Sequence, residues 1–146
     1  MGQNSSKGQD LTGLPEGENF YGFHNFGNTC YLNSVLQALY FCSPFREEVL
    51  KYYSTLTEEE FQEGRTMLMA LAEAFYSVQS NKKQNGIFRP NVIVKRLQKQ
   101  NEMFRGMMHQ DAHEFLNFLL NDISDTLEAL NKEKENDNNA KPKKGN

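Results

Sequence analysis

The pattern that most constrains the fold of this chain is a stripe of apolar residues with helical spacing in its last third. The stripe consists of Ala112, Phe115, Leu116, Leu119, Leu120, Ile123, Leu127 and Leu130. Residues three and four positions apart lie on one face of an α-helix, so the spacing predicts one long amphipathic helix. Asp111 is the expected N-cap, and Glu114 at the third helical position can complete a capping box.

Two further helices are predicted in the first half of the chain. The first is indicated by a second helical stripe, formed by Leu32, Val35, Leu36, Leu39 and Tyr40. It should begin near Thr29 and end before Pro44, because the residue before a proline disfavours helical backbone. Pro44 suits the first turn of the next helix, with Ser43 as its cap.

The middle of the chain continues this helical pattern. Thr57 to Glu60 is a capping-box pattern that predicts a helix extending to about Val78, although Gly64 weakens its first turns. A polar break at 81–86 follows, and Pro90 should open another helix through about Gln98. The fold class expected is therefore mainly α, almost without strands.

Composition excludes several classes of protein. A chain of 146 residues with a net charge of -3 fits one domain and disfavours a general nucleic-acid clamp. No apolar run approaches the ~20 residues of a membrane span. Cys30 and Cys42 are the only cysteines, too few for a disulfide framework or a four-thiolate zinc site. We expect reduced thiols in a cytoplasmic or nuclear protein.

The two ends of the chain are polar. Residues 1–20 are expected to be a flexible leader, and residues 131–146 a disordered linker or insertion. The first residues fit the Met-Gly-x-x-x-Ser pattern of N-myristoylation at Gly2, although a flexible leader can begin in this way by chance. A single acyl chain gives only weak, reversible membrane association.

Cys30 is the residue best placed for chemistry. It follows a loop rich in Gly and Asn, at the expected start of a helix, where the helix dipole and free N–H groups favour a thiolate. The same N–H groups, with the amide of Asn25, can stabilise an oxyanion. The alternative is a small core residue beside a capping loop. Cys42, at the end of the same helix, is interpreted as a packing residue.

A metal site built on histidines is not expected. His109 and His113 are four residues apart and can share one helix face, with Glu114 adjacent. The order is not His-Glu-x-x-His, and a third ligand is not evident. A solvated pair of histidines is the preferred interpretation.

Two segments carry a family resemblance. Residues 22–37 (GFHNFGNTCYLNSVLQ) resemble the cysteine box of the ubiquitin-specific proteases, and residues 110–116 (QDAHEFL) resemble that family's second conserved segment. The run at 38–46 (ALYFCSPFR) resembles the subgroup of peptidases twelve and forty-six, which are activated by WD-repeat partners. The resemblance extends over about residues 20–130.

The resemblance implies a papain-like α+β cysteine protease, of which residues 21–130 are the helical thumb while the palm and fingers are absent from this chain. Cys30 is then the nucleophile and Asn25 the oxyanion-hole amide, whereas Gln37 is assigned no chemistry. Asp111 and Glu114 match positions that bind the C-terminal tail of ubiquitin. Carboxylates suit the Arg side chains of that tail, although both residues also suit helix capping.

The departures from the family concern the catalytic base. The family's base lies far downstream in a Gly-His-Tyr context, with an orienting Asp or Asn after it, and this chain has no Gly-His pair. His24 lies in the nucleophile loop, at a position that the family does not use as base. The zinc-binding cysteine pairs of the fingers are missing too, so no cofactor is expected in this chain.

The resemblance therefore implies the N-terminal part of a deubiquitinase that is inactive alone. Ubiquitin and ubiquitinated proteins are the expected partners, with WD-repeat activators as further partners. The alternative is a non-catalytic helical fragment that binds ubiquitin or a regulator.

Overall fold

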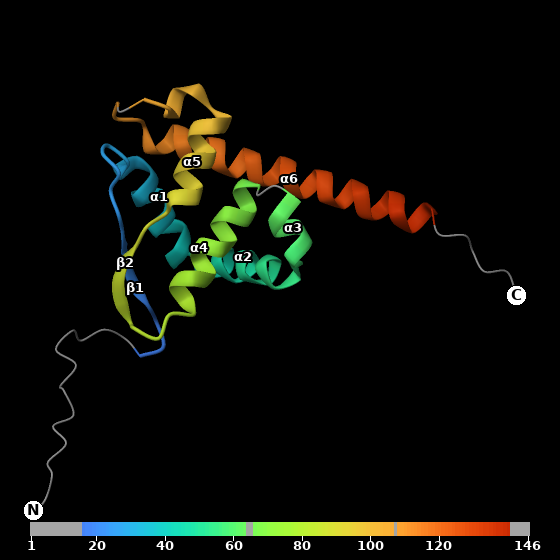
Figure 1. Cartoon of the computed structure of the whole chain (residues 1–146), viewed down its shortest axis with the longest axis horizontal. Coiled ribbons are helices and arrows are strands. Elements are labelled where there is room, and N and C mark those ends of the chain that lie inside the picture. Colours follow the sequence, from blue (N-terminus) through green and yellow to red (C-terminus); the bar gives the residue numbers. More distant parts are fainter. Residues whose placement is uncertain (1–15, 64–65, 107, 141–146) are drawn as a thin grey trace, which may run out of the picture.

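The computed structural model describes residues 16–63, 66–106 and 108–140. Helices pack against one side of a two-stranded sheet, and the last helix runs past this body as a long arm (Figure 1). The elements are β1 (Phe20–Phe23), α1 (Cys30–Phe41), α2 (Ser43–Thr55), α3 (Glu58–Glu63), α4 (Met67–Gln79), β2 (Asn85–Phe88), α5 (Asn91–Gln100), a short 3₁₀ helix (Glu102–Phe104) and α6 (Ala112–Ala140). The prediction of a mainly helical fold is confirmed.

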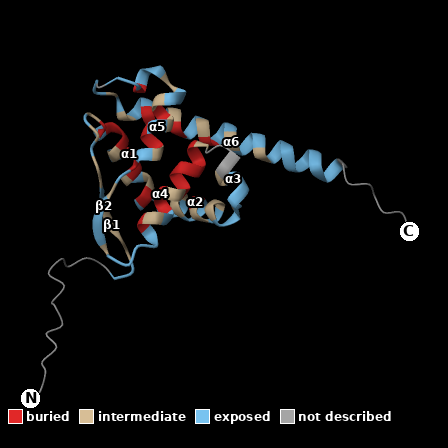
Figure 2. Cartoon of the chain, in the orientation of Figure 1, coloured by how far each residue is buried: buried red, intermediate tan, exposed pale blue. Residues whose placement is uncertain are grey.

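Helix α4 lies at the centre of the core and is buried on nearly all sides (Figure 2). It packs against α2, α5 and α6. A helix that is apolar around its whole circumference is stable only when neighbours cover it, and α4 meets that condition. Its fully buried residues include Met67, Leu71, Ala72 and Phe75.

The predicted helix from Thr57 to Val78 is two helices in the structure. Thr57 and Glu60 do form a capping box: the Thr57 backbone N–H donates to Glu60 Oε2 at 2.7 Å. They open only the short α3. A second cap, Thr66, accepts a hydrogen bond from the Met69 backbone N–H at 3.1 Å and starts α4 anew. Gly64, which was expected to weaken this region, lies outside the described residues.

The parallel pair β1–β2 was missed by the sequence analysis, which placed Asn85 and Gly86 in a polar break. Phe20 is in register with Asn85, and Tyr21 with Gly86. A Cβ atom on Gly86 would lie 2.7 Å from the Tyr21 ring, so the glycine lets that ring cross the strand. Helical and alternating patterns are both too short here to reveal strands of four residues.

The described structure includes residues 16–19, which the sequence analysis placed in the flexible leader. Glu18 forms a bidentate ion pair with Arg46, with a shortest distance of 2.7 Å. The Asn19 side chain donates to the Val78 carbonyl oxygen at 2.8 Å. Gly2, the predicted lipidation site, lies outside the described residues.

Helix α6 begins as predicted and ends later. The Asp111 carboxylate accepts a hydrogen bond from the His113 backbone N–H at 2.7 Å, which confirms the N-cap. The expectation of disorder from residue 131 is wrong as far as Ala140, where α6 ends. Extending an existing helix fixes only one residue for each new hydrogen bond, so this polar segment needs no core of its own. Of the predicted stripe, Leu120 and Leu127 are exposed.

No helix among the described residues is long and apolar enough to cross a membrane.

Candidate active site

The loop that precedes α1 makes a tight turn through two residues with left-handed backbone. Gly27 has φ 88° and Asn28 has φ 54°. Glycine adopts this conformation without a Cβ clash, and Asn tolerates it better than most residues. The turn directs the chain from β1 back into α1, so the loop and the start of the helix lie together (Figure 1).

The side chain of Asn25 organises this loop. Its Oδ1 atom accepts hydrogen bonds from the backbone N–H of Gly27 at 2.9 Å and from both the backbone N–H and the hydroxyl of Thr29, at 3.2 and 3.1 Å. Because the oxygen and nitrogen of an amide lie on opposite sides of its carbon, these bonds turn the Nδ2 atom of Asn25 away from the turn. Asn25 is exposed, and its Nδ2 atom carries two N–H donors.

Cys30 occupies the first position of α1 and is exposed. Thr29 is the N-cap, but its hydroxyl makes no cap bond, because it accepts from the Phe26 backbone N–H at 3.0 Å and donates to Asn25. Thr29 therefore does not cap the N–H groups of the first helical turn, where the thiol lies. The alternative reading of Cys30 as a core residue is wrong.

Cys42 does not have the role that the sequence suggested. It is exposed and serves at once as the C-cap of α1 and the N-cap of α2. A single residue separates the two helices, so the predicted cap Ser43 is already the first residue of α2. Position at a helix N-terminus therefore does not distinguish Cys30 from Cys42.

Two amide side chains that the sequence analysis left without a role fasten α1 to β1. Gln37 Nε2 donates to the Tyr21 carbonyl oxygen at 2.6 Å, and Asn33 Nδ2 donates to that of Phe23 at 3.0 Å. They are four residues apart, so they project from one face of the helix. Two amide residues four positions apart on an otherwise apolar helix are the sequence signal that could have identified them.

The start of α6 lies beside the start of α1. The Tyr31 ring meets the Phe115 ring edge to face, with centroids 5.6 Å apart. Because Phe115 follows Glu114 directly, this contact brings the predicted tail-binding residues, Asp111 and Glu114, to the end of the molecule that carries Cys30. Both carboxylates are exposed.

No base for Cys30 is found among the residues that the structure describes. None of the three histidines is hydrogen-bonded to the thiol: His24 packs against Phe26 at 4.9 Å, His113 Nε2 lies 3.2 Å from Asn117 Nδ2, and His109 is exposed. Burial raises the pKa of Tyr31, and nearby Cys30 raises it further, so this phenol stays neutral. The described residues also contain no cluster of three metal-ligating side chains.

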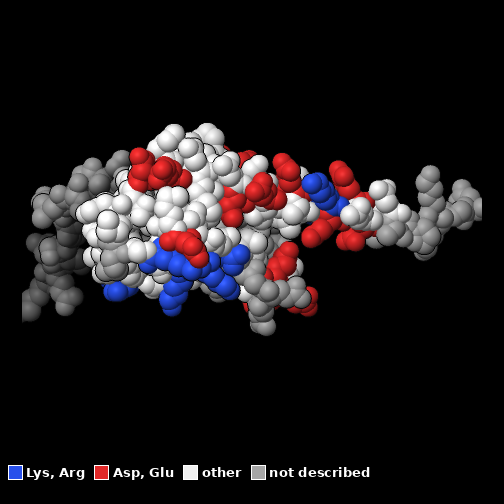
Figure 3. Space-filling view, turned by 90° about the horizontal axis from the view of Figure 1, so that it is seen from above, with Lys and Arg blue, Asp and Glu red and all other residues white. Residues whose placement is uncertain are grey.

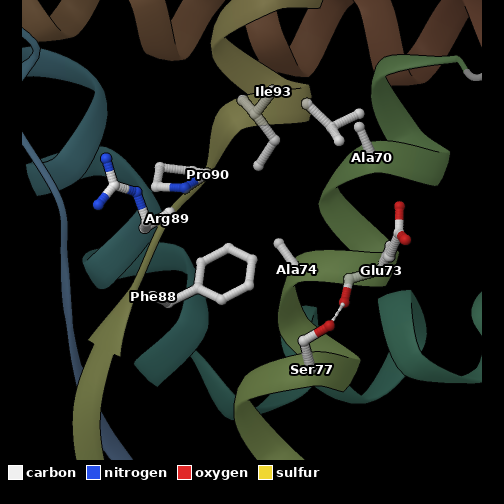
Figure 4. A pocket seen from close by; sticks show the side chains of 9 residues that line it. Ala70, Glu73, Ala74, Ser77, Phe88, Arg89, Pro90 and Ile93 are labelled. Atoms are coloured by element: carbon white, nitrogen blue, oxygen red, sulfur yellow. Dashed lines mark hydrogen bonds between the residues drawn. The ribbon is translucent and has the colours of Figure 1, made fainter. Parts of the chain in front are cut away.

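A small pocket of about 120 Å³ between α4 and the start of α5 is separate from this site (Figure 4). Its walls include Ala70, Ala74 and Ile93. The Ser77 hydroxyl, which also lines it, donates a hydrogen bond to the Glu73 backbone carbonyl oxygen at 2.7 Å. None of the predicted site residues lines it.

Known proteins resemble the chain over most of its length. The family model described as ubiquitin carboxyl-terminal hydrolase matches residues 21–144. Ubiquitin carboxyl-terminal hydrolase 4 of Arabidopsis thaliana is 52% identical over 130 residues, which are 88% of this chain and 35% of that protein. Ubiquitin carboxyl-terminal hydrolase 12 of Salmo salar is 46% identical over 136 residues, 91% of this chain and 35% of the relative. The chain thus spans about a third of the length of these relatives.

One solved structure supports the fold. The SAGA Ubp8/Sgf11/Sus1/Sgf73 DUB module bound to ubiquitin aldehyde contains a chain that superposes with a TM-score of 0.57 at 23% identity. The match covers 73% of this chain and 24% of that one. At this identity the comparison supports the arrangement of the helices and strands.

Proposed function

The chain belongs to the ubiquitin carboxyl-terminal hydrolase family, and from this membership we propose that it is the nucleophile-bearing thumb of a cysteine deubiquitinase. The reaction is hydrolysis of the isopeptide or peptide bond after the C-terminal Gly of ubiquitin. The observation that carries the proposal is the exposed thiol of Cys30 at the start of α1, beside a loop that orients the Asn25 amide. Activity is proposed for a longer protein, since the chain spans 35% of its relatives' length.

Each step of the proposed reaction assigns work to residues of this chain. The Cys30 thiolate attacks the carbonyl carbon after the terminal Gly, and the carbonyl oxygen becomes an oxyanion. First-turn N–H groups of α1 and Nδ2 of Asn25 stabilise that charge. The amine leaves with the proton that the base took from the Cys30 thiol, and a thioester remains on Cys30. Water then hydrolyses the thioester, which releases ubiquitin with a free C-terminal carboxylate and restores the thiol.

The carboxylates at the start of α6 are proposed to bind the basic tail of ubiquitin. Charge-assisted hydrogen bonds between carboxylate and guanidinium are short and directional. Asp111 commits its Oδ1 atom to the His113 N–H, which leaves Oδ2 for a ligand. Glu114 is exposed as well.

The base and the residue that orients it are proposed to lie in the remainder of the domain. General-base assistance contributes typically ~10²–10⁴ in rate, and positioning contributes more. We therefore expect the 146-residue chain alone to leave a fluorogenic ubiquitin substrate intact. Joining it to the C-terminal remainder of a relative's domain should restore hydrolysis, and Cys30→Ser should abolish it again.

Two outcomes would overturn parts of this proposal. Hydrolysis by the chain alone, lost in Cys30→Ser, would show that His24, His109 or His113 is the base. An inactive joined protein that still binds ubiquitin would favour the alternative function, a non-catalytic ubiquitin-binding fragment.

A further inference from the structure

Strand β2 has one paired edge and one open edge. The Phe20 N–H donates to the Gln84 carbonyl oxygen at 2.7 Å, and the His24 N–H donates to that of Phe88 at 2.9 Å. Backbone groups of successive residues in a strand point in opposite directions, so the N–H and C=O groups of Asn85 and Ile87 point away from β1. Among the described residues the sheet contains only these two strands.

The outer edge of β1 is closed by side chains of α1. The outward carbonyl oxygens of Tyr21 and Phe23 accept the bonds from Gln37 and Asn33 described above. The helix therefore occupies the place where a further strand would pair with β1. In the part of the chain that the structure describes, a third strand can add only beside β2.

The surface around the open edge suits an extended chain. The Ile87 side chain is 73% exposed, which is unusual for an isoleucine in a strand. A shallow hollow of about 840 Å³ adjoins it, with Tyr21 and the backbone of Gly86 in its wall. Parallel sheets are normally covered and rarely consist of two strands, so this ribbon resembles an incomplete sheet.

The charges around the edge favour an acidic occupant. Residues 74–90, which include β2 and the residues on either side of it, contain three Lys and Arg and no Asp or Glu, in a chain whose net charge is -3. Lys82 and Lys83 precede β2, Arg89 follows it, and all three are exposed. Figure 3 shows the side of the molecule that lies uppermost in Figure 1, where Lys and Arg side chains gather in one area and most Asp and Glu side chains lie elsewhere on that face. A second copy paired antiparallel along this edge would set Lys82 and Lys83 against Arg89 of its partner, which is repulsive.

We propose that the open edge of β2 binds an extended, acidic peptide segment of a partner protein as a third strand. The backbone groups of Asn85 and Ile87 supply the main-chain hydrogen bonds, Ile87 supplies apolar contact, and the flanking basic residues attract acidic ends. This surface is independent of Cys30, so the proposal and the proposed hydrolase activity can fail separately.

The test uses a short labelled peptide with alternating Val and Thr at its centre and Asp and Glu at both ends. Titration into the 146-residue chain is followed by fluorescence anisotropy and by amide hydrogen exchange. Saturating peptide should slow exchange at Asn85 and Ile87, whose N–H groups face outward. Gly86 and Phe88, which already face β1, should change little and serve as internal controls.

Two variants separate strand pairing from charge attraction. Ile87→Pro removes an outward N–H that β1 does not use, so it should preserve the fold and weaken the peptide at least fivefold. Lys82→Glu with Lys83→Glu should also weaken it. The matched control, Lys95→Glu with Lys99→Glu on α5, makes the same change of charge away from the edge and should have a smaller effect. Circular dichroism establishes that each variant is folded.

Three results would overturn the proposal. One is the absence of binding up to about 1 mM peptide, the weak end of measurable affinity. Another is binding without protection of Asn85 and Ile87. The last is an equal loss in the α5 control, which would mean that the basic surface attracts any acidic chain.

Discussion

Asn25 has two separable tasks in the proposed site, and substitution can distinguish them. Its Oδ1 atom holds the loop by accepting three hydrogen bonds, and its Nδ2 atom is the proposed oxyanion donor. Asn25→Ala removes both functions. Asn25→Asp keeps an acceptor oxygen at the Oδ1 position and replaces the NH₂ donor with a second acceptor oxygen.

The expected effects follow from these contacts. Each net hydrogen bond contributes about 0.5–1.5 kcal/mol, and Asn25 is exposed, so water replaces part of what Asn25→Ala removes. We expect this variant to lose about 1–2 kcal/mol, a fall in Tm of roughly 2–10 °C for a chain of this size. Asn25→Asp should keep the wild-type Tm or exceed it, because a charged acceptor strengthens the loop bonds.

The activities of the two variants should not follow their stabilities. Loss of one oxyanion donor costs about 10²–10³ in kcat, so in the protein joined to its C-terminal remainder both variants should lose activity. Thermal unfolding of the 146-residue chain and steady-state hydrolysis of a fluorogenic ubiquitin substrate measure the two quantities. Asn25→Asp with kcat within threefold of wild type would refute the oxyanion role. An unchanged Tm in Asn25→Ala would refute the role in the loop.

Three further predictions test the fold by thermal or urea unfolding. Gly86→Ala should cost about 1–3 kcal/mol, because its Cβ would lie 2.7 Å from the ring of the facing tyrosine, whereas Gly22→Ala, with no atom closer than 3.9 Å, should be nearly neutral. Leu119→Ala should cost about 2–5 kcal/mol as a fully buried residue, and the exposed Leu127→Ala less than about 1 kcal/mol. Burial raises the pKa of the Asp122 carboxyl above its ordinary value of 3.8 in the folded protein. Protonated Asp122 therefore stabilises the fold relative to the ionised form below pH 3.8, and this contribution is lost as the pH rises through the raised pKa. Asp122→Asn should therefore be more stable than wild type at neutral pH and equal to it in acid.

Local signals in the sequence predicted the helices and most of their starts. Asp111 and Thr57 were recognised as caps, and both make the expected bonds to backbone N–H groups. The position of Cys30 at the start of a helix followed from the apolar stripe and the loop before it. These features depend on residues within one or two turns of each other, and such information is present in any short window of the chain.

The strand pair and the role of Cys42 could not be predicted in this way. Phe20 pairs with Asn85, 65 positions later, and no pattern within either short segment indicates which segment it pairs with. Cys42 was interpreted as a packing residue because it lies near the end of α1, where the helix dipole does not favour a thiolate. In the structure one residue separates α1 from α2, and the sharp change of direction leaves Cys42 on the surface.

The long-range contacts that the sequence did not reveal hold the strand that leads into the proposed nucleophile loop. Local bonds already join Asn25 to Thr29, the residue before Cys30, but they do not hold this loop against the rest of the fold. Gln37 and Asn33 bind the strand from which that loop emerges, and β2 pairs with the same strand from its other side. The Cys30 thiol and the proposed oxyanion donor are therefore held together by contacts among the described residues. In the proposed function, a base from the remainder of the domain has only to approach an arrangement that these residues already order.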